Sequence, residues 1–269
     1  MKTDLAPRPQ LELSGPKLRL AFEGLLARAE EQGGVEAYVE ALKIKSSLFG
    51  DALQGGLEPA AFRTLCAHIA TVRRRVGPYL GPDSFQGLRA RIAGLLEGRE
   101  DTGTADARMA AFCAAFPEDR DHRWVRDLAA EILHNVDPER YPLMQRWVWD
   151  ARANTGVLRE IWHGEDVDAM RIDVADGYAT FLMLREELAQ YLAANGVFRD
   201  VLWYVDVLTA QVYADYIGER GGMYLRTDFA TPEDPMLHTR RILGLDGVDA
   251  SGRTRLKAVD GVAEILPGH

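Results

Sequence analysis

Paired glycine and proline residues divide this chain into short segments. The positions of these helix-breaking pairs constrain the fold more than any other feature of the sequence. Breaks fall at Gly33-Gly34, Gly55-Gly56, Gly77-Pro78 and Gly221-Gly222. Neither residue type is favoured inside a regular element, so each break separates one element from the next. Between the breaks, apolar residues recur at the three- and four-residue spacing of amphipathic helices. The sequence therefore predicts a series of short helices joined by tight turns.

The first helix illustrates the pattern. It is expected to open at Ser14 and Pro16 and to bury Leu18, Phe22 and Leu25 on one face. Further helices are predicted over residues 35–49, 59–76, 84–96, 109–116, 121–135, 176–195, 198–218 and 231–243.

The same pattern suggests a division of the chain. Residues 1–14 contain two prolines and are expected to form a flexible tail. Residues 15–97 form an N-terminal subdomain of antiparallel helices. The polar residues 98–104 are either a surface loop or a soft domain boundary. Residues 104–269 are an aromatic-rich, acidic α+β part, which is either a second unit or continuous with the first.

One region does not follow the helical pattern. Residues 141–163 hold clustered Trp and Val on both sides of Asn154-Thr155-Gly156, which favours a β-hairpin over two short helices. A second hairpin is predicted around Asp260-Gly261. The expected fold class is mainly α (α+β), an antiparallel helical bundle-like core with one or two small β-hairpins.

Composition indicates a soluble protein of the cytoplasm. Of 269 residues, 47% are hydrophobic and 27% are charged, and no run approaches the ~20 apolar residues of a membrane span. The N-terminus lacks the apolar stretch of a secretory signal. Cys66 and Cys113 lie apart within apolar helical patterns and are expected to be free core thiols in a reducing compartment.

Charge and missing motifs exclude several functions. The net charge is −9, with the acidic excess after residue 100, so binding over a large nucleic-acid surface is not expected. The chain has no phosphate-binding loop, no dinucleotide-binding glycine motif and no G-x-S-x-G elbow. Two cysteines cannot build a thiolate zinc cage. No nucleotide cofactor is therefore expected.

A Glu-x-x-His spacing occurs at Glu131/His134, and the spacing recurs at Glu160/His163. On a helix, such a pair lies on one face and can bind one metal ion, with Asp127 one turn before Glu131. The alternative interpretation extends the stripe through Arg123 and makes it a solvated ladder of alternating charge, which we favour. Glu160 and His163 would point to opposite faces of a predicted strand.

The Glu131/His134 pair in a helical chain resembles the heme-oxygenase-like di-iron oxidases in this feature. That resemblance implies iron or manganese, further glutamates such as Glu186 or Glu187, and an Asp/His pair on a late helix. The predicted helix over residues 198–218 has no histidine, so the chain is not assigned to that family.

Aromatic residues are concentrated in the C-terminal part. They either line a ligand pocket or form core and partner-binding surface; the candidates are Trp147, Trp149, Trp162, Trp203 and Tyr204. We therefore expect a non-enzymatic accessory protein whose acidic, aromatic-rich C-terminal part docks a partner protein or a small ligand. The alternative is a helical metal-dependent oxidoreductase that uses Glu131 and His134. The sequence carries no signal of the oligomeric state or of the partner's identity.

Overall fold

The structure is a computed structural model that describes residues 9–164, 166–167, 169–222 and 234–246. Within these residues, the α-helices are α1 (Gly15–Glu30), α2 (Val35–Gln54), α3 (Pro59–Ala67), α4 (Pro82–Leu96), α5 (Ala105–Ala114), α6 (Trp124–Val136), α7 (Val157–Glu160), α8 (Tyr178–Ala194), α9 (Val201–Gly222) and α10 (Leu237–Leu243). Single 3-10 turns lie at η1 (Gly77–Tyr79), η2 (Thr102–Thr104) and η3 (Arg120–His122). The predicted mainly helical fold is confirmed.

Several helix boundaries differ from prediction, and two of the differences have a local cause. The third helix ends at Ala67 rather than near residue 76, and turns follow it. The β-branched residues Ile69, Thr71 and Val72 have low helix propensity, which is consistent with this early end. α6 begins at Trp124 rather than at residue 121. The Asp119 side chain accepts hydrogen bonds from the backbone N–H groups of Asp121 and His122 and so holds these residues in η3.

The predicted β-hairpin over residues 141–163 is wrong. Asp150 and Thr155 exchange backbone hydrogen bonds of 2.9 and 3.3 Å, so the chain reverses at the predicted turn, but no strand flanks it. The residues before the turn are buried in succession instead of alternating between two faces, and α7 follows it. Gly156 has φ +122°, and a Cβ there would lie 2.7 Å from the Val148 carbonyl oxygen, so the turn requires glycine. The second predicted hairpin, at Asp260-Gly261, lies outside the described residues.

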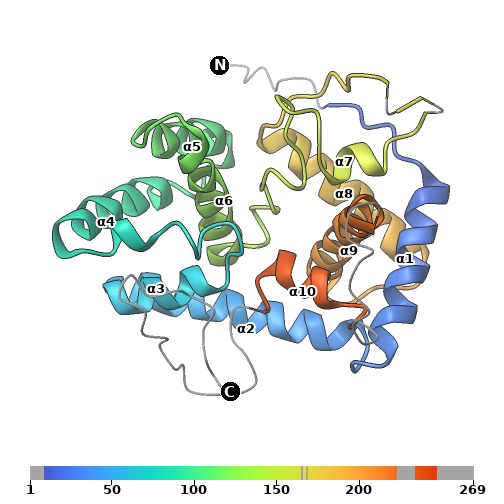
Figure 1. Cartoon of the computed structure of the whole chain (residues 1–269), viewed down its shortest axis with the longest axis horizontal. Coiled ribbons are helices and arrows are strands. Elements are labelled where there is room, and N and C mark those ends of the chain that lie inside the picture. The colour runs from blue at the N-terminus through green and yellow to red at the C-terminus, as the bar shows by residue number, and fades with distance from the viewer. Residues whose placement is uncertain (1–8, 165, 168, 223–233, 247–269) are drawn as a thin grey trace.

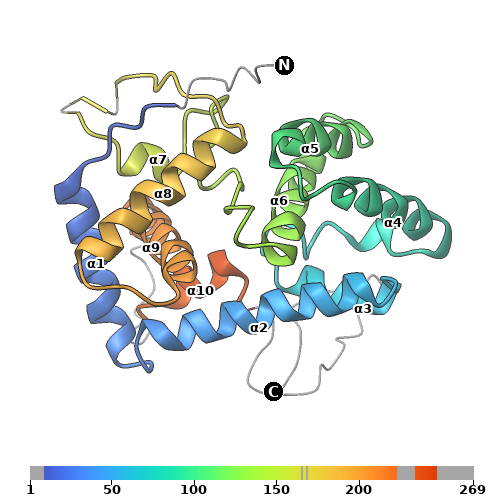
Figure 2. The ribbon, with the colours of Figure 1, turned by 180° about the vertical axis from the view of Figure 1, so that it is seen from behind.

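The helices form two groups that share one long element. Figures 1 and 2 show α2 running along one edge of the molecule beneath both groups, with α3–α6 over one half and α1 and α7–α10 over the other. At ~1.5 Å per residue, the 20 residues of α2 extend about 30 Å. Buried apolar side chains from Leu18 to Leu243 form one continuous cluster, so the polar residues 98–104 do not separate two cores.

None of the described helices combines the length and the apolar character that a membrane crossing needs.

Candidate functional site

α6 is the helix that carries the candidate metal ligands, and it is buried on almost every side. Its apolar residues Trp124, Leu128 and Ile132 are in the core, as predicted. The polar stripe is buried as well: Asp127, Glu131 and His134 are only 1%, 2% and 4% exposed. The interpretation as a solvated charge ladder is therefore wrong.

Glu131 is neutralised by a lysine from α2. Lys45 Nζ lies 2.8 Å from Glu131 Oε2, and both side chains are at most 3% exposed. Asn135 Nδ2 donates to the same oxygen at 2.7 Å, and Gln145 Nε2 donates to Oε1 at 2.8 Å. Lys45 also donates to the Leu243 carbonyl at 2.8 Å. A buried charge is tolerated when it is paired and hydrogen-bonded in this way.

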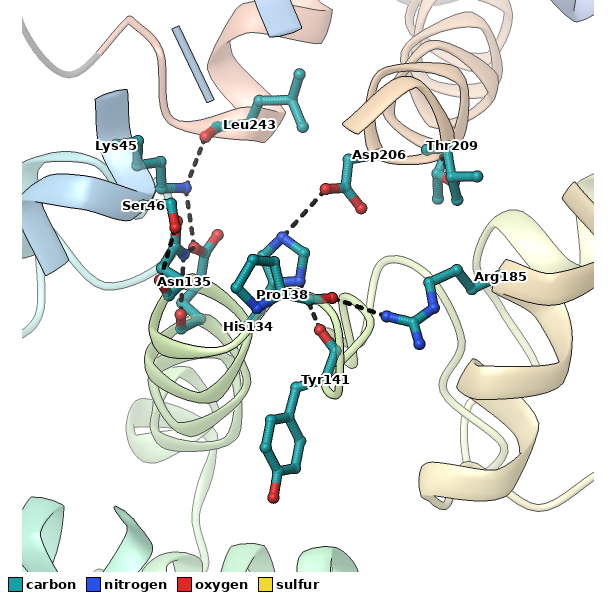
Figure 3. Close-up of polar contacts among 12 residues, drawn as sticks. Lys45, Ser46, His134, Asn135, Pro138, Tyr141, Arg185, Asp206, Thr209 and Leu243 are labelled. Atoms are coloured by element: carbon teal, nitrogen blue, oxygen red, sulfur yellow. Dashed lines mark hydrogen bonds and ion pairs between the residues drawn. The ribbon is translucent and has the colours of Figure 1, made fainter. Parts of the chain in front are cut away.

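His134 is held between a carbonyl and a carboxylate (Figure 3). Its Nδ1 donates to the Tyr141 carbonyl at 2.8 Å, and its Nε2 lies 3.1 Å from Asp206 Oδ2 on α9. Both nitrogens face acceptors, so the doubly protonated imidazolium fits the site. Burial lowers the pKa of His134, but the carboxylates of Asp206 and Glu131, with the Tyr141 carbonyl, outweigh it and raise the pKa above its usual value.

The third member of the stripe faces the loop after α6. Asp127 accepts from Arg146 twice, at 3.1 Å from the guanidinium and at 3.2 Å from the backbone N–H. At the C-terminal end of α6, Arg185 from α8 donates to the Pro138 and Glu139 carbonyls at 2.8 Å each. α6 is thus tied by polar contacts to α2, α9 and its own following loop, and that loop is tied to α8.

This arrangement does not gather metal ligands. Among the described residues, no group of three or more His, Cys, Asp and Glu side chains is placed to hold a metal ion. Each possible metal ligand of the α6 stripe is instead paired with its own cation or carboxylate. A protonated His134 also has no lone pair to give to a metal.

The second Glu-x-x-His spacing does not form a ligand pair on one helix. Glu160 ends the four-residue helix α7, while His163 is exposed beyond it. Glu186 and Glu187 are half-buried on α8. None of these four residues joins the α6 stripe in a group able to hold a metal ion.

The setting of Asp206 does not favour a catalytic dyad. Its contact with His134 is an ion pair rather than an aligned hydrogen bond, and Oδ2 accepts no hydrogen bond from the described residues. The adjoining cavity, which Thr209 also lines, has a volume of only about 20 Å³. That volume holds about one water molecule, so this cavity beside Asp206 is too small for a substrate of ordinary size.

Most of the candidate aromatic residues are core. Trp149 is fully buried and donates from Nε1 to the Val174 carbonyl at 2.9 Å. Trp147 packs on Tyr213 with ring centroids 5.6 Å apart, and Trp162 is 6% exposed. Half-buried Trp203 meets the His134 ring edge-on. Trp147, Trp149 and Trp162 therefore belong to the core, and Trp203 packs against it.

Tyr204, the fifth candidate, lines an open groove of about 530 Å³. This groove, called the α2–α9 groove below, is lined by Glu36, Val39, Glu40, Gly196, Val197, Phe198, Arg199, Asp200 and Tyr204. Phe198 is 77% exposed, although the sequence suggested the start of a helix there. Sequence reasoning missed this residue and the α2 carboxylates, because the groove joins segments far apart in the chain.

The comparisons with known proteins do not identify a relative. No protein-family model, no curated protein and no solved structure matches this chain.

Proposed function

We propose that this chain is a non-enzymatic binding protein that docks a partner protein through the α2–α9 groove. The observation that carries this proposal is Phe198, a large aromatic side chain that is 77% exposed at the rim of an open groove. Aromatic side chains are frequent anchors of protein interfaces, and here one stands at the rim of a groove. The open shape favours a partner segment over a small ligand, which needs a more enclosed pocket.

The charges around the groove suggest the chemistry of the partner. Glu36, Glu40 and Asp200 supply three carboxylates, and Lys43 pairs with two of them at 2.8 and 2.9 Å. Tyr204 donates to Glu36 at 2.7 Å, and this hydrogen bond is the main reason that the pKa of Glu36 is lowered. Glu36 therefore stays ionised at neutral pH. A segment with an apolar side chain for Phe198 and a lysine or arginine for Glu36 fits this groove.

The alternative, a metal-dependent oxidoreductase, is not favoured by a specific observation. Its proposed ligands Glu131 and His134 are engaged with Lys45 and Asp206. Elemental analysis of protein grown with iron and manganese supplied tests the point. Stoichiometric metal that disappears in His134→Ala protein would establish the alternative and refute the binding proposal.

The docking test uses a photo-crosslinking amino acid at position 198 in the full chain, expressed in its native cell. Mass spectrometry then identifies any crosslinked protein, and calorimetry measures its affinity for the purified wild type. We expect Phe198→Ser and Glu36→Gln each to weaken binding by ~10-fold or more. Leu26→Ser is the matched control, because Leu26 is 45% exposed on α1 and does not line the groove. Equal affinity of all variants would refute the assignment of this groove.

A further inference from the structure

A cavity of about 170 Å³ lies between α5, the loop after α6 and the start of α8. Nine residues line it, and three of them carry sulfur: Met109, Cys113 and Met144. The described part of the chain has only five methionines and two cysteines. Nine residues drawn at random from it would seldom include three of those seven, so the lining of this cavity is enriched in sulfur.

The sulfur-bearing side chains reach the cavity from two sides. Met109 and Cys113 are four residues apart on α5, so they project from the same face of that helix with Cβ atoms about 5–6 Å apart. Met144 comes from the loop after α6 and is 1% exposed. Methionine commonly fills gaps in a core, because its flexible side chain adapts to irregular space. Here two methionines border a space that they do not fill, so packing alone does not account for them.

Three charged side chains also line the cavity, and all three have partners. Arg126 pairs with the Asp176 side chain and donates to the Asp176 carbonyl at 2.9 Å. Asp106 accepts from the Tyr178 backbone N–H at 2.7 Å. Arg126 and Asp176 cancel in charge, so Asp106 leaves the lining net negative. Asp106 is exposed and Cys113 is half-buried, which gives a small cation a way in from solvent.

We propose that this cavity binds one Cu(I) ion through the Cys113 thiolate and the thioethers of Met109 and Met144. Thiolate and thioether sulfurs are soft ligands, and they select Cu(I) over the harder divalent cations. A monovalent cation and one thiolate form a neutral unit, which a partly buried site tolerates better than an excess charge. The site is compatible with the lack of a His, Cys, Asp and Glu group among the described residues, because two of its three ligands are methionines.

Binding of the ion displaces the proton of the thiol. Burial raises the pKa of Cys113; Arg126 lowers it and Asp127 raises it further, with a net rise. The thiol is therefore protonated at neutral pH, and Cu(I) has to compete with that proton. The apparent affinity for Cu(I) should rise ~10-fold per pH unit between about pH 6 and pH 8.

A competition titration tests the site on the full chain, with Cu(I) held by a coloured chelator under anaerobic, reducing conditions. We expect one Cu(I) per wild-type chain, with X-ray absorption at the copper edge showing sulfur ligands only. Cys113→Ser should weaken binding ~100-fold or more, and Met109→Leu and Met144→Leu should each weaken it ~10-fold. Leucine and methionine are close in volume, so these two variants should keep the wild-type fold by circular dichroism.

Met170→Leu and Cys66→Ala are the matched controls, since neither residue lines the cavity, and both should bind Cu(I) as wild type does. Wild type that takes no Cu(I) from the chelator would overturn the proposal. Binding lost in Cys113→Ser but unchanged in both Met→Leu variants would also overturn it, since a lone thiol would then hold the ion. The cavity shares no residue with the α2–α9 groove, so the proposal does not depend on the proposed function.

Discussion

The ion pair between His134 and Asp206 gives the sharpest prediction about stability. Both side chains are 5% exposed, and His134→Ala leaves the Asp206 carboxylate buried without its cation. Removing one member of a buried pair typically costs ~3–5 kcal/mol. Asp206→Asn should cost less, ~1–3 kcal/mol, because a neutral His134 can accept a hydrogen bond from the new amide. The double variant His134→Ala/Asp206→Ala should cost less than the sum of the single alanine variants, by ~1–3 kcal/mol.

The same pair makes stability depend on pH in a definite direction. The pKa of His134 is raised in the folded protein above its usual value of ~6.5. Folding therefore binds a proton in the window above pH ~6.5, and the stabilisation is fully present below that pH. It is lost as the pH rises through the folded pKa. Wild type should thus lose stability relative to the double alanine variant as the pH is raised above ~6.5.

Urea denaturation followed by tryptophan fluorescence measures both effects, with Trp203 close to the His134 ring as a reporter. A coupling energy under ~0.5 kcal/mol would show that the two groups do not interact in the folded protein. So would a stability difference between wild type and the double variant that stays constant from pH 6 to pH 9.

Three further predictions concern single residues. Trp124 is 4% exposed and packs on Phe116, so Trp124→Ala should cost ~3–5 kcal/mol by urea denaturation; a loss under ~1 kcal/mol contradicts its place in the core. Burial raises the pKa of both thiols, and it raises that of completely buried Cys66 more than that of half-buried Cys113. A thiol reagent should therefore modify Cys113 first. The reverse order, or a disulfide between the two residues, contradicts the structure. Gly244 has φ +75°, and a Cβ there would lie 1.8 Å from the His68 carbonyl oxygen, so Gly244→Ala should lower the melting temperature by several degrees, and an unchanged value refutes this packing.

The helices could be predicted from the sequence because each carries its own local signal. The stripe of α6, the breaks at Gly33-Gly34 and Gly55-Gly56, and the long patterns of α8 and α9 depend only on neighbours within a few turns. The prediction of a β-hairpin around Trp147 and Trp149 was wrong because the structure there depends on distant contacts. The bulky residues of this segment have high β propensity, but tertiary packing buries them in succession, and the described part of the chain offers no strand to pair with them.

The polar stripe on α6 was misjudged because its partners are distant in the sequence. Lys45 comes from α2 and Asp206 from α9, and neither is recognisable as a partner before the helices are packed. One local signal was present: α6 also carries apolar residues such as Ala129, Ala130 and Leu133 beside the stripe. A helix that is apolar almost all round is a buried helix, and its charged residues are then buried with it.

The buried ion pairs of α6 also determine which parts of the protein can unfold locally. Its charges meet Lys45, Arg146 and Asp206, which belong to three other segments, so α6 cannot separate from one neighbour while the others stay in place. Its backbone amides should therefore exchange their hydrogens with solvent only when the whole molecule unfolds. The helix α7 is only four residues long, about one turn, and can exchange through local opening. Slow exchange should thus trace α6 and its partners across both halves of the molecule.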